Sequence, residues 1–245
     1  LDKAFEEFIL SIKNKNLDYN TKAQIYEYWF GEKSGENESV VKEAKLAGEA
    51  FIEAHPDKEL GYYVIGTVYF NDDIFDKAQE YYLEAIERDS SNFISWYQLV
   101  FADIELNNSK NLYEHSSAAM RFYPEQPIFY LFNGVSLSDM KKYEEAIKVF
   151  EKGRFLSADK KLTANFDTYI ADIYNVLGDK EKMYRQYDRV LKNDPDNIYV
   201  LNNYAYFLSL DNVRLDEALK MSAKTIEKEP KNVTYLDTYA WVLYK

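Results

Sequence analysis

Few side chains in this sequence are of the types that carry out catalysis. The 245-residue chain has two histidines and no cysteine, which excludes a disulfide framework, a thiolate metal site and a cysteine nucleophile. His55 precedes Pro56, and His115 lies in a segment with helical periodicity. Neither histidine has a metal ligand or a nucleophile close to it in the sequence, which favours a structural or surface role for both.

Three polar segments resemble ion-binding loops without meeting the requirements of such loops. GEKSG at 31–35 lacks the glycine spacing and the preceding strand of a phosphate-binding loop. NDD at 71–73 and NDPDN at 193–197 have neither the glycine nor the glutamate that a calcium loop needs at its sixth and twelfth positions. We interpret the first as a plain loop and the other two as turns between helices, with Asp196 or Asn197 capping the next helix.

Neighbouring carboxylates are also poorly placed for acid–base catalysis. Glu144 and Glu145 are adjacent, as are Asp72 and Asp73, and adjacent residues on a helix point about 100° apart. The sequence shows no activated nucleophile, no cluster of metal ligands and no phosphate loop. It therefore predicts a protein that is not an enzyme and that uses no cofactor or metal.

The charge of the chain limits the partners that we expect. There are 42 acidic and 30 basic residues, a net charge of −12, and this field repels the phosphates of nucleic acids and of anionic membranes. No run of 18 apolar residues occurs, so no segment is predicted to span a membrane. The negative charge either attracts basic ligands or keeps a helical surface soluble, and we favour solubility.

Small residues recur at a fixed interval along the chain. Gly66 and Gly134 are separated by two intervals of 34 residues. Ala85, Ala119 and Gly153 follow one another at a single interval. Self-similarity at one period is typical of stacked supersecondary units. Apolar residues within a unit recur at helical spacing in two runs, which predicts two antiparallel helices. We expect Gly66 to be small because the two helix backbones approach there, with aromatic side chains filling the space on either side.

The period and the positions of the small residues resemble the tetratricopeptide repeat. The resemblance implies an all-α fold, a right-handed α-α superhelix or solenoid of antiparallel helix pairs. The expected units are 59–92, 93–126, 127–163, 164–197 and 198–232, followed by a partial unit at 233–245. We place three extra residues of the third unit in its second helix or in the following turn, LSADKKLT. One extra residue of the fifth unit is placed in the turn around LDNVRLD.

The two ends of the array differ from the repeats between them. Residues 1–58 predict three amphipathic helices, LDKAFEEFILSIKNKN, TKAQIYEYWF and SVVKEAKLAGEAFIEAHP, with GEKSGENES as a solvated loop. The last two helices take the place of a degenerate repeat at 25–58, and we expect residues 1–58 to cap one continuous solenoid. The helix in 233–245 lacks a partner helix. We expect the natural chain to continue beyond it, in preference to self-association through this helix.

Two features bear on where the protein is located. The sequence starts at Leu1 rather than Met, which is compatible with a signal or lipid-anchor segment before it. Residues 201–245 resemble the C-terminal repeats of bacterial tetratricopeptide-repeat proteins, many of them predicted to belong to the cell envelope. The resemblance implies a bacterial protein and favours the cell envelope over the cytoplasm.

Ligands of tetratricopeptide-repeat proteins usually lie along a concave face, and the resemblance implies that positions 2, 5, 9 and 12 of each unit point to it. In the C-terminal half these positions mix amides, acids, hydroxyls and aromatic rings, which predicts a binding groove. The candidate groove residues are Asn165, Thr168, Asp172, Asn175, Tyr199, Asn202, Tyr206, Asp237, Trp241 and Tyr244. A second candidate patch, in the N-terminal half, contains Tyr63, Phe70, Tyr97 and Phe101. Packing is the favoured interpretation of that patch, with the helices in 1–30 filling the groove there.

We therefore expect a non-catalytic scaffold for protein–protein interaction, which holds a peptide or a partner domain in its concave groove. No Lys or Arg occupies the inward positions, so the cationic clamp with which some family members hold a C-terminal carboxylate is absent. Two alternatives stay open. One is a glycan-binding module that stacks sugars on Tyr199, Tyr206, Trp241 and Tyr244, and the other is a purely structural segment of a larger assembly protein.

Overall fold

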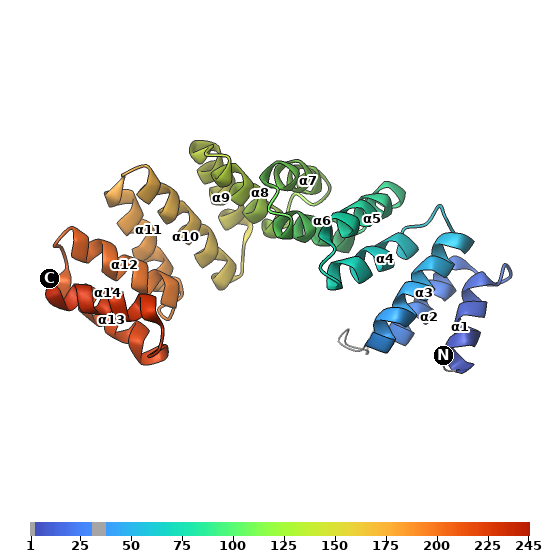
Figure 1. Ribbon diagram of the computed structural model, residues 1–245. Coiled ribbons are helices and arrows are strands. Elements are labelled where there is room, and N and C mark those ends of the chain that lie inside the picture. Colours follow the sequence, from blue (N-terminus) through green and yellow to red (C-terminus); the bar gives the residue numbers. More distant parts are fainter. Residues whose placement is uncertain (1–2, 31–37) are drawn as a thin grey trace. The chain divides into compact units, whose positions relative to one another are not determined.

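The computed structural model describes residues 3–30 and 38–245, and these residues form fourteen α-helices and no strand (Figure 1). The all-α fold of antiparallel helix pairs is confirmed. Residues 1–124 and 125–245 make up two compact units, and each unit is described by itself. One continuous solenoid through both stays a prediction. The predicted loops GEKSG and GEKSGENES lie mostly or wholly at 31–37, outside the described residues.

Each unit contains seven helices, counted over the described residues. Those of unit 1 are α1 (Lys3–Lys13), α2 (Tyr19–Phe30), α3 (Glu38–Ala54), α4 (Leu60–Asn71), α5 (Phe75–Arg88), α6 (Phe93–Glu105) and α7 (Ser109–Phe122). Those of unit 2 are α8 (Pro127–Asp139), α9 (Tyr143–Leu156), α10 (Lys160–Val176), α11 (Lys180–Asn193), α12 (Ile198–Leu210), α13 (Leu215–Lys228) and α14 (Val233–Tyr244). In unit 2, α8, α10, α12 and α14 are the first helices of successive pairs.

The turn inside each helix pair repeats along the chain. After α4, α6, α8 and α10 the turn has three residues. Its middle residue has a positive φ in every case: Asp73 (58°), Asn107 (51°), Lys141 (61°) and Gly178 (76°). The last turn residue donates its N–H to a carbonyl of the preceding helix, as Ile74 does to Tyr69 at 2.9 Å, which is the Schellman way of ending a helix. The turn between α12 and α13 is one residue longer, as expected.

Helix α10 begins earlier than the sequence analysis placed it. It starts at Lys160, so residues 160–163 form its first turn instead of part of the preceding connection. Asp159 caps the helix by accepting the backbone N–H groups of Lys161 at 2.7 Å and Leu162 at 3.1 Å. A side-chain cap contributes about 1 kcal/mol. The extra residues therefore lengthen α10, which contributes four of the ten candidate groove residues.

Both units contain the same packing of a ring on a glycine. A Cβ atom on Gly66 of α4 would lie 2.8 Å from the Tyr82 ring of α5. In unit 2, a Cβ atom on Gly134 of α8 would lie 2.3 Å from the Phe150 ring of α9. Both rings are fully buried. The reason for the glycines thus differs from our expectation, because the ring lies directly on the bare helix backbone rather than beside a close crossing of two backbones.

Helices α1, α2 and α3 of unit 1 share an aromatic core. Phe5 and Phe8 of α1 and Phe51 of α3 are buried. The Phe8 ring stacks on Trp29 of α2 with centroids 5.5 Å apart. Stacked and tilted ring pairs of this kind stabilise a core beyond their burial alone. This aromatic cluster holds α1 and α2 against α3.

Candidate functional site

A hollow of about 420 Å³ is formed by α8, α10 and the beginning of α12 in unit 2, and we call it the Asp172 hollow. Its lining residues are Leu131, Asn165, Thr168, Tyr169, Asp172, Asn197 and Tyr199. The other three lining residues of α10 follow Asn165 at offsets of three, four and seven residues. That spacing brings them to one face of the helix.

Asp172 is the charged residue among the described residues that line this hollow. Tyr187 of α11 donates its hydroxyl to Oδ1 at 3.0 Å, and Tyr199 donates to Oδ2 at 3.1 Å. Burial raises the pKa of the Asp172 carboxyl, and the two hydrogen bonds act in the opposite direction. Burial and the Asp172 charge raise the pKa of Tyr199 to about 12. Tyr199 is therefore a neutral donor at neutral pH.

A second hollow, of about 590 Å³, lies between α12 and α14, and we call it the Trp241 hollow. It is lined by Tyr206, Leu210, Asp237, Ala240, Trp241 and Tyr244. The Trp241 and Tyr244 rings have centroids 5.8 Å apart and are tilted by 35°. Lys245 Nζ lies 5.0 Å from the centroid of the Trp241 ring. The ring face of Trp241 is thus accessible to a cation.

Comparison with known proteins agrees with this geometry. The family profile described as tetratricopeptide repeat matches residues 61–92, which contain most of α4 and all of α5. The chain contains a tetratricopeptide repeat and has the tetratricopeptide-repeat fold. It is 25% identical over 162 residues to the TPR repeat-containing protein MJ1428 of Methanocaldococcus jannaschii. That match covers 53% of this chain and 28% of the length of its relative.

Solved structures share the tetratricopeptide-repeat fold at low sequence identity. YrrB, described as a TPR protein with an unusual peptide-binding site, is 19% identical, with a TM-score of 0.59 over 78% of this chain and 96% of YrrB. PilF of Pseudomonas aeruginosa is 17% identical, with a TM-score of 0.65 over 97% and 99% of the two chains. MamA is 19% identical, with a TM-score of 0.60 over 68% and 95%. The tetratricopeptide-repeat fold is in general a scaffold for protein partners, and such repeats are typically not catalytic.

Most of the candidate groove residues line one of the two hollows. Asn165, Thr168, Asp172 and Tyr199 line the Asp172 hollow, and Tyr206, Asp237, Trp241 and Tyr244 line the Trp241 hollow. Asn175 is exposed on α10 and lines neither. Asn202 differs from our expectation, because its side chain is 5% exposed and its Nδ2 donates to Asn203 Oδ1 at 3.1 Å. Helix α12 packs against α14 as well as α13. This packing leaves the Asn202 side chain little access to solvent.

Five of the lining residues are not among the site residues predicted from the sequence. They are Leu131, Tyr169, Asn197, Leu210 and Ala240. Tyr169 follows Asn165 by four residues, and Leu210 follows Tyr206 by four, so helical spacing could have identified both. Asn197 caps α12 by accepting the N–H of Val200 at 3.1 Å. Its place in the hollow depends on how α12 packs against α10, which periodicity does not reveal.

The second candidate patch, in unit 1, is divided among separate ring contacts. Tyr63 packs on Tyr82 with centroids 6.1 Å apart, and Phe70 packs on Phe75 at 5.2 Å. Tyr97 and Phe101 pack on each other at 4.7 Å. All four candidate side chains are half-buried. These contacts favour packing over ligand binding for this patch.

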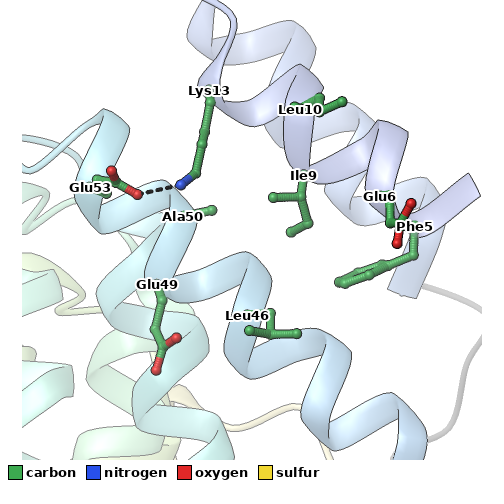
Figure 2. A pocket seen from close by; sticks show the side chains of 9 residues that line it. All are labelled: Phe5, Glu6, Ile9, Leu10, Lys13, Leu46, Glu49, Ala50 and Glu53. Atoms are coloured by element: carbon green, nitrogen blue, oxygen red, sulfur yellow. Dashed lines mark hydrogen bonds and ion pairs between the residues drawn. The ribbon is translucent and has the colours of Figure 1, made fainter. Parts of the chain in front are cut away.

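Unit 1 also has a groove that the sequence analysis did not identify, between α1 and α3 (Figure 2). It has a volume of about 430 Å³ and is lined by Phe5, Glu6, Ile9, Leu10, Lys13, Leu46, Glu49, Ala50 and Glu53. Figure 2 shows Phe5 and Ile9 projecting from α1 toward α3, with the ion pair between Lys13 Nζ and Glu53 Oε2, 2.5 Å apart, at the other end. The pairing of α1 with α3, across 40 residues of sequence, creates this groove, and local patterns carry no signal for it.

The two histidines have partners within unit 1. His115 Nδ1 of α7 lies 2.8 Å from Asp103 Oδ2 of α6, a carboxylate that is fully buried. His55 Nε2 lies 2.9 Å from Nζ of the buried Lys22. Burial and the positive charge of Lys22 lower the pKa of His55. In both cases the imidazole joins two helices or helix ends.

Two further observations concern the described part of the chain, residues 3–30 and 38–245. No three His, Asp or Glu side chains within it converge in a way that could hold a metal ion. None of its helices is both long enough and apolar enough to cross a bilayer. The two hollows of unit 2 present hydrogen-bonding groups, aromatic rings and one carboxylate each.

Proposed function

We propose that unit 2 binds an extended segment of a partner protein along α10, α12 and α14. The observation that carries this proposal is the pair of hollows on these first helices, each lined by one carboxylate and at least two aromatic rings. An extended segment can place side chains in such hollows while its backbone pairs with polar side chains. The exposed Asn165 in the Asp172 hollow is suited to that pairing.

The exposure of the rings supports a binding surface rather than a core. Tyr199 is 49% exposed, Tyr206 39% and Tyr244 79%. Rigid aromatic side chains provide large contact areas with little loss of conformational entropy, and they contribute much of the free energy of binding at protein interfaces. YrrB, with which this chain shares a fold, is described as having a peptide-binding site. This description supports a peptide as the class of ligand.

Selection from a display library of random peptides tests the proposal. The chain would be used as it stands, and the affinity of enriched, dye-labelled peptides would be measured by fluorescence anisotropy. Substituting both Tyr206→Ala and Trp241→Ala should weaken binding at least about tenfold, because each ring removed from a binding hot spot costs more than about 1 kcal/mol. Phe155→Ala is the matched control, since Phe155 of α9 is 88% exposed and lines neither hollow.

Two results would contradict the proposal. If the double variant binds the selected peptides as tightly as the unchanged chain does, these hollows do not form the site. If no peptide is enriched and a glycan array instead shows binding that Trp241→Ala abolishes, the carbohydrate alternative replaces the peptide. A control with Phe155→Ala in the same array would show whether loss of any exposed ring has that effect.

A further inference from the structure

We infer that the Asp172 hollow receives the cationic side chain of a lysine or arginine from the bound segment. This inference rests on the proposed function, because it specifies which side chain of the partner the site selects. Three observations support it. The Asp172 carboxylate has no charged partner among the lining residues, the exposed rings of Tyr169 and Tyr199 are held in fixed positions, and other classes of ligand fit the hollow poorly.

The negative charge of the hollow has neutral partners within the described residues. Asp172 accepts hydrogen bonds from the hydroxyls of Tyr187 and Tyr199, and no Lys or Arg is among the lining residues. A carboxylate has about four acceptor positions, so positions remain for a ligand donor. A charge withdrawn from water is costly unless it is paired. A cationic side chain from the ligand would supply that pairing.

The two rings of the hollow are positioned before any ligand arrives. Tyr169 is 39% exposed, and its ring stacks on the buried Phe150 ring at 5.3 Å with an interplanar angle of 13°. Tyr199 is 49% exposed and is held by its hydroxyl bond to Asp172. A cation within about 6 Å of a ring face is attracted by the ring quadrupole. Such contacts already occur in unit 2, where Lys152 Nζ lies 5.1 Å from the Tyr130 centroid.

Other ligand classes fit the hollow less well. A calcium ion needs six to eight oxygen ligands, and Asp172 is the sole carboxylate among the described lining residues. An anion would be repelled by Asp172 and by the charge of Asp139, which also acts on Tyr169. A neutral side chain would exclude water from the carboxylate without compensating its charge. A lysine or arginine side chain satisfies the carboxylate and the ring faces together.

A positional-scanning peptide library tests this inference with the intact chain. Each sub-library carries one residue type at a fixed position and mixtures elsewhere, with Nε-acetyl-lysine as the neutral counterpart of lysine. We expect lysine or arginine sub-libraries to bind about tenfold more tightly than the acetyl-lysine sub-library, since acetylation removes both the ion pair and the cation–π contact. Asp172→Asn should remove the ion-pair part of this preference, leaving only what the cation–π contact contributes, and leave the affinity for acetyl-lysine peptides unchanged. Tyr199→Phe, which keeps the ring, should retain part of the preference.

The pH dependence of binding gives a second readout that needs no variant. Protonation of Asp172 removes its charge, so the preference for lysine over acetyl-lysine should decline on acidification. Equal affinity of the unchanged chain for lysine and acetyl-lysine peptides would overturn the inference and leave the proposed function standing. An equal loss of affinity for every sub-library in Asp172→Asn would also overturn it, because it would indicate a structural role. Absence of binding to every sub-library would instead contradict the proposed function itself.

Discussion

The α1–α3 groove of unit 1 and the Asp172 hollow of unit 2 have similar volumes but place their charges differently. In the groove, Lys13 and Glu53 form an ion pair with side chains 46% and 69% exposed. In the hollow, the half-buried Asp172 carboxylate is held by two tyrosine hydroxyls. A solvent-exposed ion pair at the edge of a groove is screened by water and salt, and it contributes little to the free energy of folding or binding. A half-buried charge acts through a lower dielectric and discriminates strongly between ligands of opposite and like sign.

The residues beneath the two cavities differ as much as the charges do. Phe5 at the groove is fully buried and packs on Phe8 and Trp29, so it belongs to the core that holds α1 and α2 in place. Tyr169 and Tyr199 of the hollow are exposed enough to meet a ligand. Cavities of equal size can therefore arise either from the packing of a helical core or from an arrangement of side chains that is suited to recognition.

The largest expected effect on stability distinguishes a core residue of the groove from a ligand-facing residue of the hollow. Phe5→Ala should destabilise unit 1 by about 3–5 kcal/mol, because it removes a fully buried ring from the aromatic core. Tyr199→Ala should cost only about 0.5–1.5 kcal/mol, the value of a typical hydrogen bond, since its ring is half exposed. Urea unfolding followed by circular dichroism measures both. Leu10→Ala, at a groove residue that is 61% exposed on the same helix, is the control and should have little effect. Similar losses for Phe5→Ala and Tyr199→Ala would remove the distinction.

The next effect tests whether the two units share their internal packing. Gly66→Leu and Gly134→Leu should each destabilise the protein by about 1–3 kcal/mol through overpacking. Gly134→Leu should be the more damaging, because its Cβ would be closer to the facing ring, 2.3 Å against 2.8 Å. Thermal unfolding compares the two variants, with Asn175→Leu, at an exposed position of α10, as the control for an added leucine. The reverse order would show that Phe150 can move aside more easily than Tyr82.

Repeat architecture was predictable from the sequence because its cause is local and recurrent. Gly66 and Gly134 report the same ring contact 68 residues apart, and a volume constraint that recurs at a fixed period is visible without any structure. The start of α10 was missed because its cap is displaced from the repeat position. Asn92 and Asn197 cap α6 and α12 directly before the predicted units 93–126 and 198–232, whereas Asp159 lies five residues before the predicted unit 164–197.

The candidate site was predictable in part for a related reason. Asp172 and Trp241 were identified because residues at fixed positions of a helix share a face. The burial of Asn202 was not, since it depends on how closely α12 and α14 pack. The tyrosine partners of Asp172 were not predictable either. They come from α11 and α12, and the pattern of a single helix contains no information about donors on its neighbours.

A smaller effect on stability is expected at His55. Unit 1 also contains a buried charge with a neutral partner, because the ammonium group of Lys22 lies against the His55 imidazole. The pKa of His55 lies below its ordinary value of 6.5 in the folded chain, owing to burial and to the charge of Lys22, with Asp57 acting in the opposite direction. Between the lowered pKa and about 6.5 the unfolded chain binds more protons than the folded one. Stability should therefore be complete above about pH 6.5 and decline as the pH falls. Thermal unfolding of the unchanged chain and of His55→Gln from pH 7.5 to 5 isolates this contribution. Identical pH dependence in the two proteins would contradict it.

The smallest effect is expected at the rim of the α1–α3 groove. Lys13→Ala should change the free energy of unfolding by less than about 1 kcal/mol, although Lys13 and Glu53 are only 2.5 Å apart. Both side chains are largely exposed, so water and salt screen their attraction, and holding two long side chains in one geometry costs entropy. Denaturant unfolding at low and high salt, with Glu53→Ala and the double variant, would give the coupling energy of the pair. A coupling well above 1 kcal/mol that persists in high salt would mean that the groove, like the hollow, holds its charge apart from water. The contrast between the two regions would then lie in their partners alone: a chain residue satisfies the charge in the groove, whereas a ligand is needed in the hollow.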